Sequence, residues 1–440
     1  MTHADIFHPD FVNEPYWWGA FRPGSEPGHD LPASTVVAIV GGGFTGLSMA
    51  LELRRQGRDV VVLEAQDLGH GASTRNGGGV SGGVNVGKRL SGRKVVYPPG
   101  VQQAILGDAA KAYGFIEDLI AREGIDCKWQ HNGRFVGAWT PKHFAAQAKT
   151  VEALNASARS GSYMVPRERQ HEEIASDLYY GGQIIGRSAC MHPALLYQGM
   201  LQACIRAGVT LCARTPVTQL EQVGGAWRVH TSRGVLQAEQ VAIATNAYTT
   251  DLTPQFKRRI VPISSHIIVT EPLPPGLAQK ILPTNRMIND TLRVRSYYRL
   301  TPDGTRVLFG GRGRFGEASV QENSALLHRF MVERMPDTAG LRVTHGWSGK
   351  VGFTFDGTPH MGEYQGMYYA LGCNGSGVAM LSWLGYQTAR KMVKAPDYAC
   401  AFDRSMPGNP FYTGTPWFLP MIGSWFRVLD KVDRAMAGGR

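Results

Sequence analysis

Three glycines near the start of the chain have the spacing of a phosphate-binding turn. Gly41, Gly43 and Gly46 follow an apolar stretch in the order Gly-x-Gly-x-x-Gly. The first permits a tight turn, the second lets the backbone approach a pyrophosphate, and the third lets a helix pack closely on a strand. Glu64, eighteen residues beyond Gly46, supplies a carboxylate that can accept hydrogen bonds from ribose hydroxyls and repel a 2′-phosphate. The chemistry indicated is dinucleotide binding.

The neighbouring residues supply the elements that this turn needs. Residues 35–40 are a β-branched apolar run that predicts a buried parallel strand, and residues 47–57 have a helical pattern that ends at Gly57. Residues 59–64 predict a second strand. The helix N-terminus between them would present unpaired N–H groups and partial positive charge to phosphate oxygens. Residues 36–64 therefore predict one βαβ unit.

Three later segments narrow the choice of dinucleotide. Residues 72–78 are small residues and glycines around Arg75, which suits a backbone that runs beside a flat ring and a pyrophosphate. Residues 241–247 predict a buried strand that ends in small polar residues. Residues 372–378 open a second helix with glycines, and its dipole would stabilise negative charge on a reduced flavin. Each segment alone also fits an ordinary loop or turn, but together they favour FAD over NAD.

With residues 347–349 (WSG) and 356–362 (DGTPHMG), these segments resemble the D-amino-acid oxidase superfamily of flavoproteins over residues 36–395. The chain most resembles the γ-glutamylputrescine oxidoreductase branch, through STRNGG, IATNAY, FGGR, FTFDGTPHMG and GCNGSGV. The motifs and the resemblance together give the expected FAD contacts: Gly41, Gly43, Phe44, Thr45, Gly46, Glu64, Ala65, Ser73, Thr74, Arg75, Asn76, Gly77, Gly78, Val217, Thr245, Asn246, Gly375, Ser376, Gly377 and Val378.

The resemblance also bears on how FAD is held. Relatives that attach flavin through a cysteine have it where this chain reads residues 350–352 (KVG), without a cysteine. Relatives that attach it through a histidine have it where this chain has Thr74 and Arg75. We therefore expect non-covalent FAD, although His70 lies just upstream. No metal site is expected.

Residues 260–312 predict strands on the substrate side of the flavin. The expected catalytic residues are His266 and Tyr298, with Trp347 and His360 near the ring. Both histidines are equally well explained as structural.

Arginines in the same stretch are candidates for binding a carboxylate, because a guanidinium binds that group in a bidentate manner. Tyr297, Tyr298 and Arg299 could form an aromatic slot with such a clamp, and Arg312 is another candidate. The alternating Arg293, Arg295 and Arg299 also fit the solvent face of a strand, and we expect that placement for two of the three.

The resemblance implies oxidation of an amine C–N bond by hydride transfer to flavin N5, which gives an imine that hydrolyses to an aldehyde plus an amine. The substrate would be γ-glutamylputrescine-like or another primary or secondary amine, with O2 or an electron carrier as acceptor. One alternative is a D-amino-acid, glycine or sarcosine-type oxidase. Another is a non-catalytic flavin-binding subunit of a dehydrogenase complex. Because the cofactor carries the chemistry, the absence of an obvious catalytic dyad is no objection.

Composition limits the classes of partner and the cellular location that we expect. The 440 residues carry a formal charge of +11 without a block of basic residues, so an anionic small molecule is favoured over nucleic acid. Six cysteines form no CxxC pair, and the N-terminus lacks the pattern of a signal peptide. No apolar run is long enough to cross a membrane. We expect a cytoplasmic monomer or homodimer.

The expected fold class is α/β (α+β): a Rossmann-like FAD-binding domain with a parallel sheet and an antiparallel meander, interlaced with a substrate domain on an antiparallel sheet. The predicted FAD domain is discontinuous, with residues 35–95, 187–258 and 341–395. Residues 96–186 and 259–340 would form the substrate domain. Residues 1–34 are expected to form an arm laid over the body, and residues 396–440 a tail packed on it.

Overall fold

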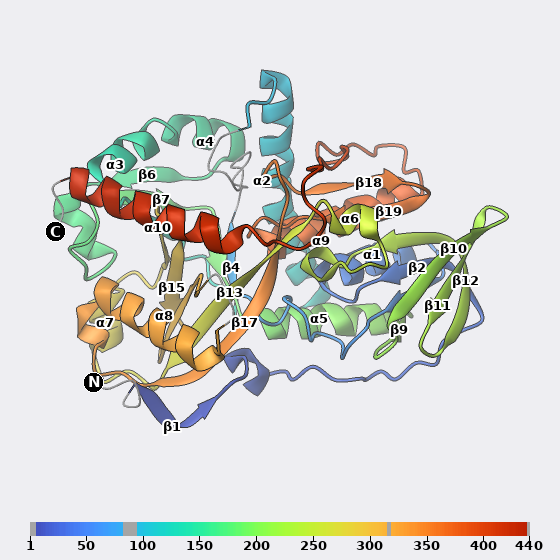
Figure 1. Cartoon of the computed structure of the whole chain (residues 1–440), viewed down its shortest axis with the longest axis horizontal. Coiled ribbons are helices and arrows are strands. Elements are labelled where there is room, and N and C mark those ends of the chain that lie inside the picture. The colour runs from blue at the N-terminus through green and yellow to red at the C-terminus, as the bar shows by residue number, and fades with distance from the viewer. Residues whose placement is uncertain (1–5, 82–94, 315–317, 438–440) are drawn as a thin grey trace.

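The structure is a computed structural model that describes residues 6–81, 95–314 and 318–437. Two large sheets lie side by side in it (Figure 1). The first sheet has the order β10 (Val217–Val223), β11 (Ala226–Thr231), β12 (Gly234–Ile243), β2 (Ser34–Val40), β3 (Val60–Leu63) and β9 (Thr210–Cys212). In addition, β19 (Met367–Leu371) pairs with β12, and β18 (His360–Tyr364) pairs with β19.

The second sheet takes its strands from other parts of the chain. Its order is β1 (Phe7–Val12), β17 (Val343–Phe353), β13 (Val261–Thr270), β16 (Val307–Gly311), β15 (Ser296–Leu300), β14 (Met287–Asp290), β5 (Arg134–Gly137), β7 (Gly182–Ile185) and β6 (Ser162–Val165). A short ribbon of β4 (Gly79–Ser81) and β8 (Ser188–Cys190) is separate from both.

The helices cover these sheets. They are α1 (Phe44–Arg55), α2 (Pro99–Glu123), α3 (Pro141–Ala148), α4 (Val151–Ala158), α5 (Pro193–Arg206), α6 (Pro254–Lys257), α7 (Leu277–Ile281), α8 (Val320–Arg334), α9 (Gly377–Met392) and α10 (Leu419–Met436). Short 3₁₀ turns lie at Tyr16–Gly19, Arg167–Glu172, Asn246–Tyr248 and Pro336–Thr338.

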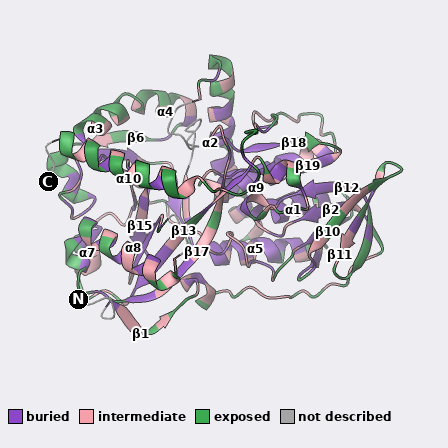
Figure 2. Ribbon diagram, viewed as in Figure 1, coloured by how far each residue is buried: buried purple, intermediate pink, exposed green. Residues whose placement is uncertain are grey.

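The parallel centre of the first sheet is buried on both faces. Val37 and Ile39 pack in the cluster that contains α1, α5 and α9, whereas Ala38 and Val40 pack against residues of the meander on the other face. This burial on both faces explains why the strand reads as a continuous apolar run. Figure 2 shows the buried positions concentrated in α1, α5, α9 and the sheets. The predicted α/β fold, including the βαβ unit and the meander β10–β11–β12, is confirmed.

The second sheet is covered on one face by α8. Tyr298, Phe309 and Ile268 pack there with Leu327 and Met331 of that helix. The opposite face turns toward the first sheet, and a cavity lies between them. Because successive residues of a strand point to opposite faces, β15 sends Tyr297 into the cavity and Tyr298 into the α8 core.

Several elements differ from the sequence expectation. The arm includes β1, which pairs with β17. The buried Trp17 of the arm packs with Ala194 of α5 and with residues of the second sheet. β14 lies within residues 260–312 in addition to the strands expected there. The tail forms α10, which crosses the front of the second sheet in Figure 1. Residues 82–94, which fall within the predicted FAD domain, lie outside the described residues.

All six cysteines are free thiols. Within the described ranges, no helix is long and apolar enough to cross a membrane. The same residues contain no group of three or more His, Cys, Asp or Glu side chains that could hold a metal ion.

Candidate active site

A cavity of about 710 Å³ lies between the two sheets. Its volume is typical of sites for cofactors and small molecules, which span roughly 300–1,000 Å³. The glycine turn before α1, the loop 69–79, the end of β12 and the start of α9 line one side. The cavity face of β13–β16 and β14–β5 lines the other. Segments far apart in the sequence therefore meet at one site.

The glycine turn has the geometry that its sequence predicts. Gly41 has a φ of +109°, which L side chains rarely adopt, and a Cβ on it would lie 2.9 Å from the carbonyl oxygen of Ala244. A Cβ on Gly46 would lie 2.0 Å from the carbonyl oxygen of Gly41. Gly43 is the N-cap of α1 and contributes no side-chain cap. The turn thus leaves a helix N-terminus open toward the cavity, as phosphate binding requires.

Glu64 closes the same end of the cavity. Its Oε2 accepts a hydrogen bond from the Gly42 N–H at 2.9 Å, and its Oε1 accepts one from the Gln66 N–H at 3.1 Å. A carboxylate has about four acceptor positions, so each oxygen keeps capacity for a ribose hydroxyl. This end fits the ADP half of a dinucleotide.

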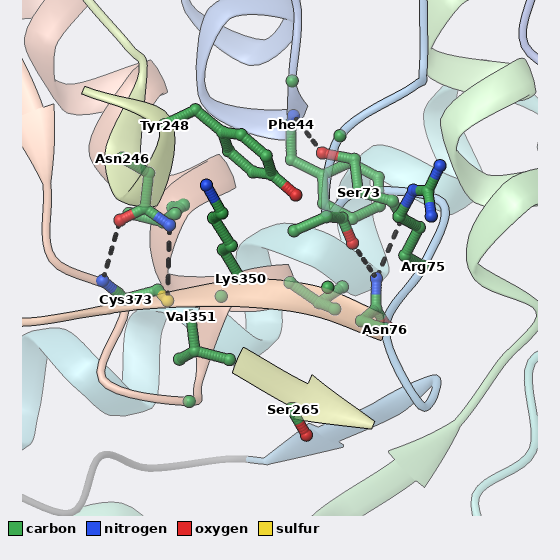
Figure 3. A pocket seen from close by; sticks show the side chains of 18 of the residues that line it. Phe44, Ser73, Arg75, Asn76, Asn246, Tyr248, Ser265, Lys350, Val351 and Cys373 are labelled. Carbon is green, nitrogen blue, oxygen red and sulfur yellow. Dashed lines mark hydrogen bonds between the residues drawn. The ribbon is translucent and has the colours of Figure 1, made fainter. Parts of the chain in front are cut away.

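The loop 73–76 is held from several sides (Figure 3). Ser73 Oγ accepts a hydrogen bond from the Phe44 N–H at 3.0 Å, and the Asn76 side-chain amide donates to the Ser73 carbonyl at 2.9 Å. Arg75 Nε donates to the His70 carbonyl at 2.7 Å. The Trp17 indole N–H donates to the Asn76 carbonyl at 2.8 Å, so the N-terminal arm helps to fix the loop.

The second glycine-rich helix start is shaped by Asn246. This residue has a φ of +43°, and its Oδ1 accepts hydrogen bonds from the N–H groups of Gly372 at 3.0 Å and Cys373 at 3.3 Å. Its Nδ2 lies 3.4 Å from Cys373 Sγ, as Figure 3 shows. The N-cap of α9, Ser376, makes no side-chain cap bond. A second open helix N-terminus therefore lines the same cavity.

Most of the residues expected to contact FAD line this cavity, and the exceptions are Gly46, Thr74 and Gly78. Gly46 packs against the turn and against Ile39 of β2. Thr74 is buried, with its hydroxyl donating to the Gly69 carbonyl at 2.6 Å. Gly78 lies against the Met191 carbonyl. These three residues lie behind the residues that line the cavity and contact them or their neighbours.

The four side chains expected to be catalytic do not line the cavity. Trp347 is buried, and its indole N–H donates to the Arg75 carbonyl at 2.9 Å, so it supports the loop from behind. His360 is also buried, with Nε2 at 3.0 Å from an oxygen of Asp356.

The strand alternation explains the placement of the other two. Tyr298 points into the α8 core, where its hydroxyl lies 2.7 Å from that of Tyr179. His266 faces the same side of the sheet, and burial lowers its pKa. The neighbours Ser265 and Tyr297 line the cavity instead, with their hydroxyls 3.1 Å apart. Burial raises the pKa of Tyr297 to about 12, so its phenol is neutral at physiological pH.

The arginines also differ from the expectation. Arg299 is buried and donates to the carbonyls of Gly78 and Met191 at 3.0 and 3.1 Å. It therefore connects the second sheet with the loop 69–79 and with the segment before α5. We expected two of Arg293, Arg295 and Arg299 to lie on the solvent face of a strand. Arg293 and Arg295 instead line the cavity, as Arg312 does.

Sequence reasoning missed several lining residues, above all Arg134, Asn289 and Lys350. Arg134 and Asn289 lie on β5 and β14, which join the second sheet through long-range pairing that one sequence does not reveal. A period-two reading of residues 293–299 could have grouped Arg295 with Tyr297, because both share one strand face.

The lining is strongly basic. Glu64 is the sole carboxylate among the described lining residues, whereas Arg75, Arg134, Arg293, Arg295, Arg312 and Lys350 are cationic. Lys350 Nζ lies 5.6 Å from the centre of the Tyr248 ring, and Figure 3 shows the two side chains next to each other. Burial lowers the pKa of Arg312 to about 10 and also lowers that of Arg134 and Arg295. An anionic ligand suits this environment.

Comparison with known proteins agrees with this geometry. The family model for FAD-dependent oxidoreductases (DAO) matches residues 37–391. The γ-glutamylputrescine oxidoreductase of Escherichia coli (strain K12) is 30% identical over 405 residues, which cover 90% of this chain and 93% of that protein. A probable oxidoreductase, OrdL, of Haemophilus influenzae is 29% identical over 361 residues, covering 79% of this chain and 80% of that protein. The crystal structure of glycine oxidase from Geobacillus kaustophilus superposes with a TM-score of 0.69 at 21% identity, covering 84% of this chain and 97% of that one.

Proposed function

Because this chain belongs to the DAO family of FAD-dependent oxidoreductases, we propose that it oxidises the C–N bond of an amine held between FAD and the second sheet. The observation that carries the proposal is the shared cavity. One wall has the glycine turn, Glu64 and two open helix N-termini, which fit FAD, and the other wall has polar and cationic side chains that no cofactor contact accounts for.

When bound, FAD supplies the acceptor for a hydride from the carbon that carries the amine, and the resulting imine hydrolyses to a carbonyl compound and an amine. The protein has to bind and orient the substrate and keep water away. Tyr297 is placed to do this, because its ring lies against Gly77 of the loop and Gly310 of β16. At both glycines a Cβ would approach the ring within 2.6 Å.

The cationic wall also favours the reactive form of the substrate. An amine must be neutral to give up a hydride from its carbon, and nearby positive charge lowers the pKa of an ammonium group. The guanidinium groups of Arg295 and Arg312 therefore make a strong general base unnecessary. The side-chain oxygens near Tyr297, from Ser265 and Asn289, are available to accept hydrogen bonds from the amine.

A second candidate, oxidation of an amino acid, is favoured by the same arginines. In a substrate without a carboxylate, the protonated amine would bring an unpaired cation into a cavity that is already cationic. A carboxylate beside the amine would instead be paired with a guanidinium.

We also propose that FAD is bound without a covalent link. Relatives attach flavin through a histidine or a cysteine, and among the described lining residues these types are His70 and Cys373. The Cys373 thiol is engaged by Asn246 at 3.4 Å and by the Gly352 carbonyl at 3.6 Å. Acid precipitation should release the flavin into the supernatant, and a yellow pellet would contradict this assignment.

The proposed activity is tested by mixing the purified yellow protein with amines and amino acids without oxygen. Bleaching of the flavin absorbance, with a carbonyl product identified by mass spectrometry, is the expected result. Admitting O2 and measuring its consumption then distinguishes an oxidase from an enzyme that needs an electron carrier. A colourless protein, or bleaching by no compound, would overturn the proposal and favour a non-catalytic subunit.

A further inference from the structure

Three arginines on the cavity face of the second sheet form no ion pair in the part of the chain that the structure describes, although the Asp290 carboxylate, itself paired with Arg334, offsets part of the effect of burial on the pKa of Arg295. Arg134, Arg295 and Arg312 make no ion pair and no side-chain hydrogen bond within the described residues. The Nε atom of Arg134 is buried without a partner. Arg312 stacks on the Phe353 ring, with its guanidinium carbon 5.3 Å from the ring centre.

The strand register places Arg295 and Arg312 together, and Arg134 lies farther along the same cavity face, on the second strand from Arg295. Ser296 pairs with Gly311, so Arg295 and Arg312 extend from neighbouring strands side by side. Met287 pairs with Arg134, and Met287 and Asn289 share the face on which Tyr297 lies. The charge of Arg295 lowers the pKa of both Arg134 and Arg312, after the larger effect of burial. The guanidinium group of Arg295 is therefore close enough to repel those of Arg134 and Arg312.

Several other arginines have a carboxylate partner, whereas the buried Arg299 donates to backbone carbonyls. Arg334 binds Asp290 at 3.0 Å, and Arg286 binds Glu173 at 2.9 Å. Arg293, at the rim of the same cavity, binds Asp430 at 2.8 Å and Asp433 at 2.7 Å. A desolvated charge without a partner is costly, so such a group indicates a ligand that supplies the opposite charge.

One carboxylate would leave this patch with a large excess of positive charge. We propose that the substrate is an amine that carries two carboxylates, such as an acidic amino acid or an N-(carboxyalkyl) amino acid, and that Arg134, Arg295 and Arg312 bind them. This inference rests on the proposed function, because it takes the ligand of this wall to be the amine that is oxidised. The Asn289 side-chain oxygen, buried without a partner next to the patch, is an acceptor for the amine N–H.

The FAD phosphates do not explain the arginines. The pyrophosphate position is defined by the turn at Gly41–Gly46 and by α1, on the first sheet, whereas all three arginines come from the second sheet. Glu64, the residue expected to bind the ribose, lies beside that turn. The patch thus lies on the wall that faces the cofactor site.

The test is binding of unreactive acids to the FAD-loaded protein, measured by calorimetry. Glutarate and succinate are compared with their monoamides, glutaramate and succinamate, which keep the shape and lose one charge. At least one diacid should bind tenfold or more tightly than its monoamide. Equal affinities for both pairs would overturn the inference, and this comparison uses only the unmodified protein.

Variants then locate the effect. R295Q and R312Q should each weaken diacid binding at least tenfold and monoamide binding less. The matched control R342Q removes an exposed arginine and should change neither affinity. If R295Q and R312Q lower FAD affinity and leave the diacid-to-monoamide ratio unchanged, the arginines serve the cofactor and the inference fails.

The dicarboxylate site and the proposed oxidation can be refuted independently of each other. Tight diacid binding without flavin bleaching by any amine would refute the oxidation and keep the dicarboxylate site. Bleaching by amines without preference for a second carboxylate would refute the dicarboxylate site and keep the oxidation.

Discussion

At the scale of single residues, neighbours in sequence have opposite roles. Tyr297 lies in the cavity with its hydroxyl near Ser265, whereas Tyr298 lies in the α8 core with its hydroxyl bonded to Tyr179. The two differ only in the strand face from which they extend. This alternation makes the assignment of the cavity testable with two conservative substitutions.

We expect Tyr298→Phe to lower the free energy of unfolding by about 1–2 kcal/mol, because the Tyr179 hydroxyl loses a buried partner. Its kcat/KM should stay within about twofold. Tyr297→Phe should instead reduce kcat/KM by roughly tenfold, the worth of one hydrogen bond near the substrate. Denaturant unfolding and steady-state kinetics of both variants check this. The reverse pattern would mean that the strand faces are misassigned.

The glycine turn gives a second prediction. Gly46→Ala should abolish FAD retention, because the new Cβ would lie 2.0 Å from the Gly41 carbonyl oxygen and push α1 away from β2. Flavin content of the purified protein measures this. Gly107→Ala is the matched control, since that helix position has no atom within 4 Å of an added Cβ. The control should keep FAD and gain about 0.5–1 kcal/mol of stability. Full FAD content in Gly46→Ala would contradict the assigned turn.

His192 predicts a dependence of stability on pH. Burial, with a further contribution from Arg299, lowers its pKa from 6.5 to about 4. Between these values the unfolded chain binds a proton that the native protein does not, so stability should fall as the pH drops from 6.5 to 4. His192→Asn keeps a side chain that can cap α5 and removes this titration. Its Tm should fall less than that of the unchanged protein over this window, whereas identical Tm profiles would argue against the assignment.

At the scale of elements, local patterns predicted those whose partners are near in sequence. The βαβ unit, the meander and α9 follow from apolar periodicity and glycines within about 30 residues. Strands β1 and β14 were not predicted, because the first is an edge strand and the second has four residues. Arg134 entered the site only through the pairing of β5 with β14 across more than 150 residues. Motifs therefore predicted the side of the cavity proposed to bind FAD. They did not predict the side proposed to bind the substrate.

Helix α10 connects the tail to the cavity. Phe426 lines the cavity, and the Asp430 carboxylate accepts hydrogen bonds from the backbone N–H groups of Arg293 and Val294 and from the Arg293 guanidinium. Met421 and Trp425 of this helix are exposed, and so is Trp417 just before it. The buried positions of α10 are Gly423 and Asp430, with no large apolar side chain among them, so we expect the polar bonds to matter for its position.

Asp430→Asn should therefore loosen α10. We expect faster proteolytic cleavage near residues 419–436 and a loss of about 1–3 kcal/mol of stability, because a buried charge-assisted network is broken. Asp433→Asn removes one bond to Arg293 at a more exposed position and should have a smaller effect. Limited proteolysis of the two variants beside the unchanged protein would refute this role if all three were cut at the same rate.

At the scale of the whole molecule, the cofactor site joins two interleaved parts of the chain. The loop 73–76 from the first is held by Trp17 and Trp347, and Arg299 from the second sheet binds the Gly78 carbonyl. We propose that these parts are the FAD and substrate domains expected from sequence. A ligand bound between them should stabilise both.

Removal of FAD should lower the Tm, and adding it back should restore the Tm in a concentration-dependent manner. Hydrogen exchange should accelerate most at the cavity lining, in residues 41–46, 69–79, 244–248 and 373–378. The surface hairpin of β10 and β11 serves as an internal control whose exchange should not change. Uniform exchange changes, or none, would place the cofactor elsewhere.

The central claim is that a C–H bond of an amine is broken in this cavity as the flavin is reduced. The most direct measurement is a single turnover without oxygen, with the amine that bleaches the flavin best and its analogue deuterated at the carbon bearing nitrogen. The account predicts that deuterium slows bleaching severalfold and that the deuterated position is oxidised in the product. Bleaching at equal rates, with no deuterium lost from that carbon in the product, would contradict it.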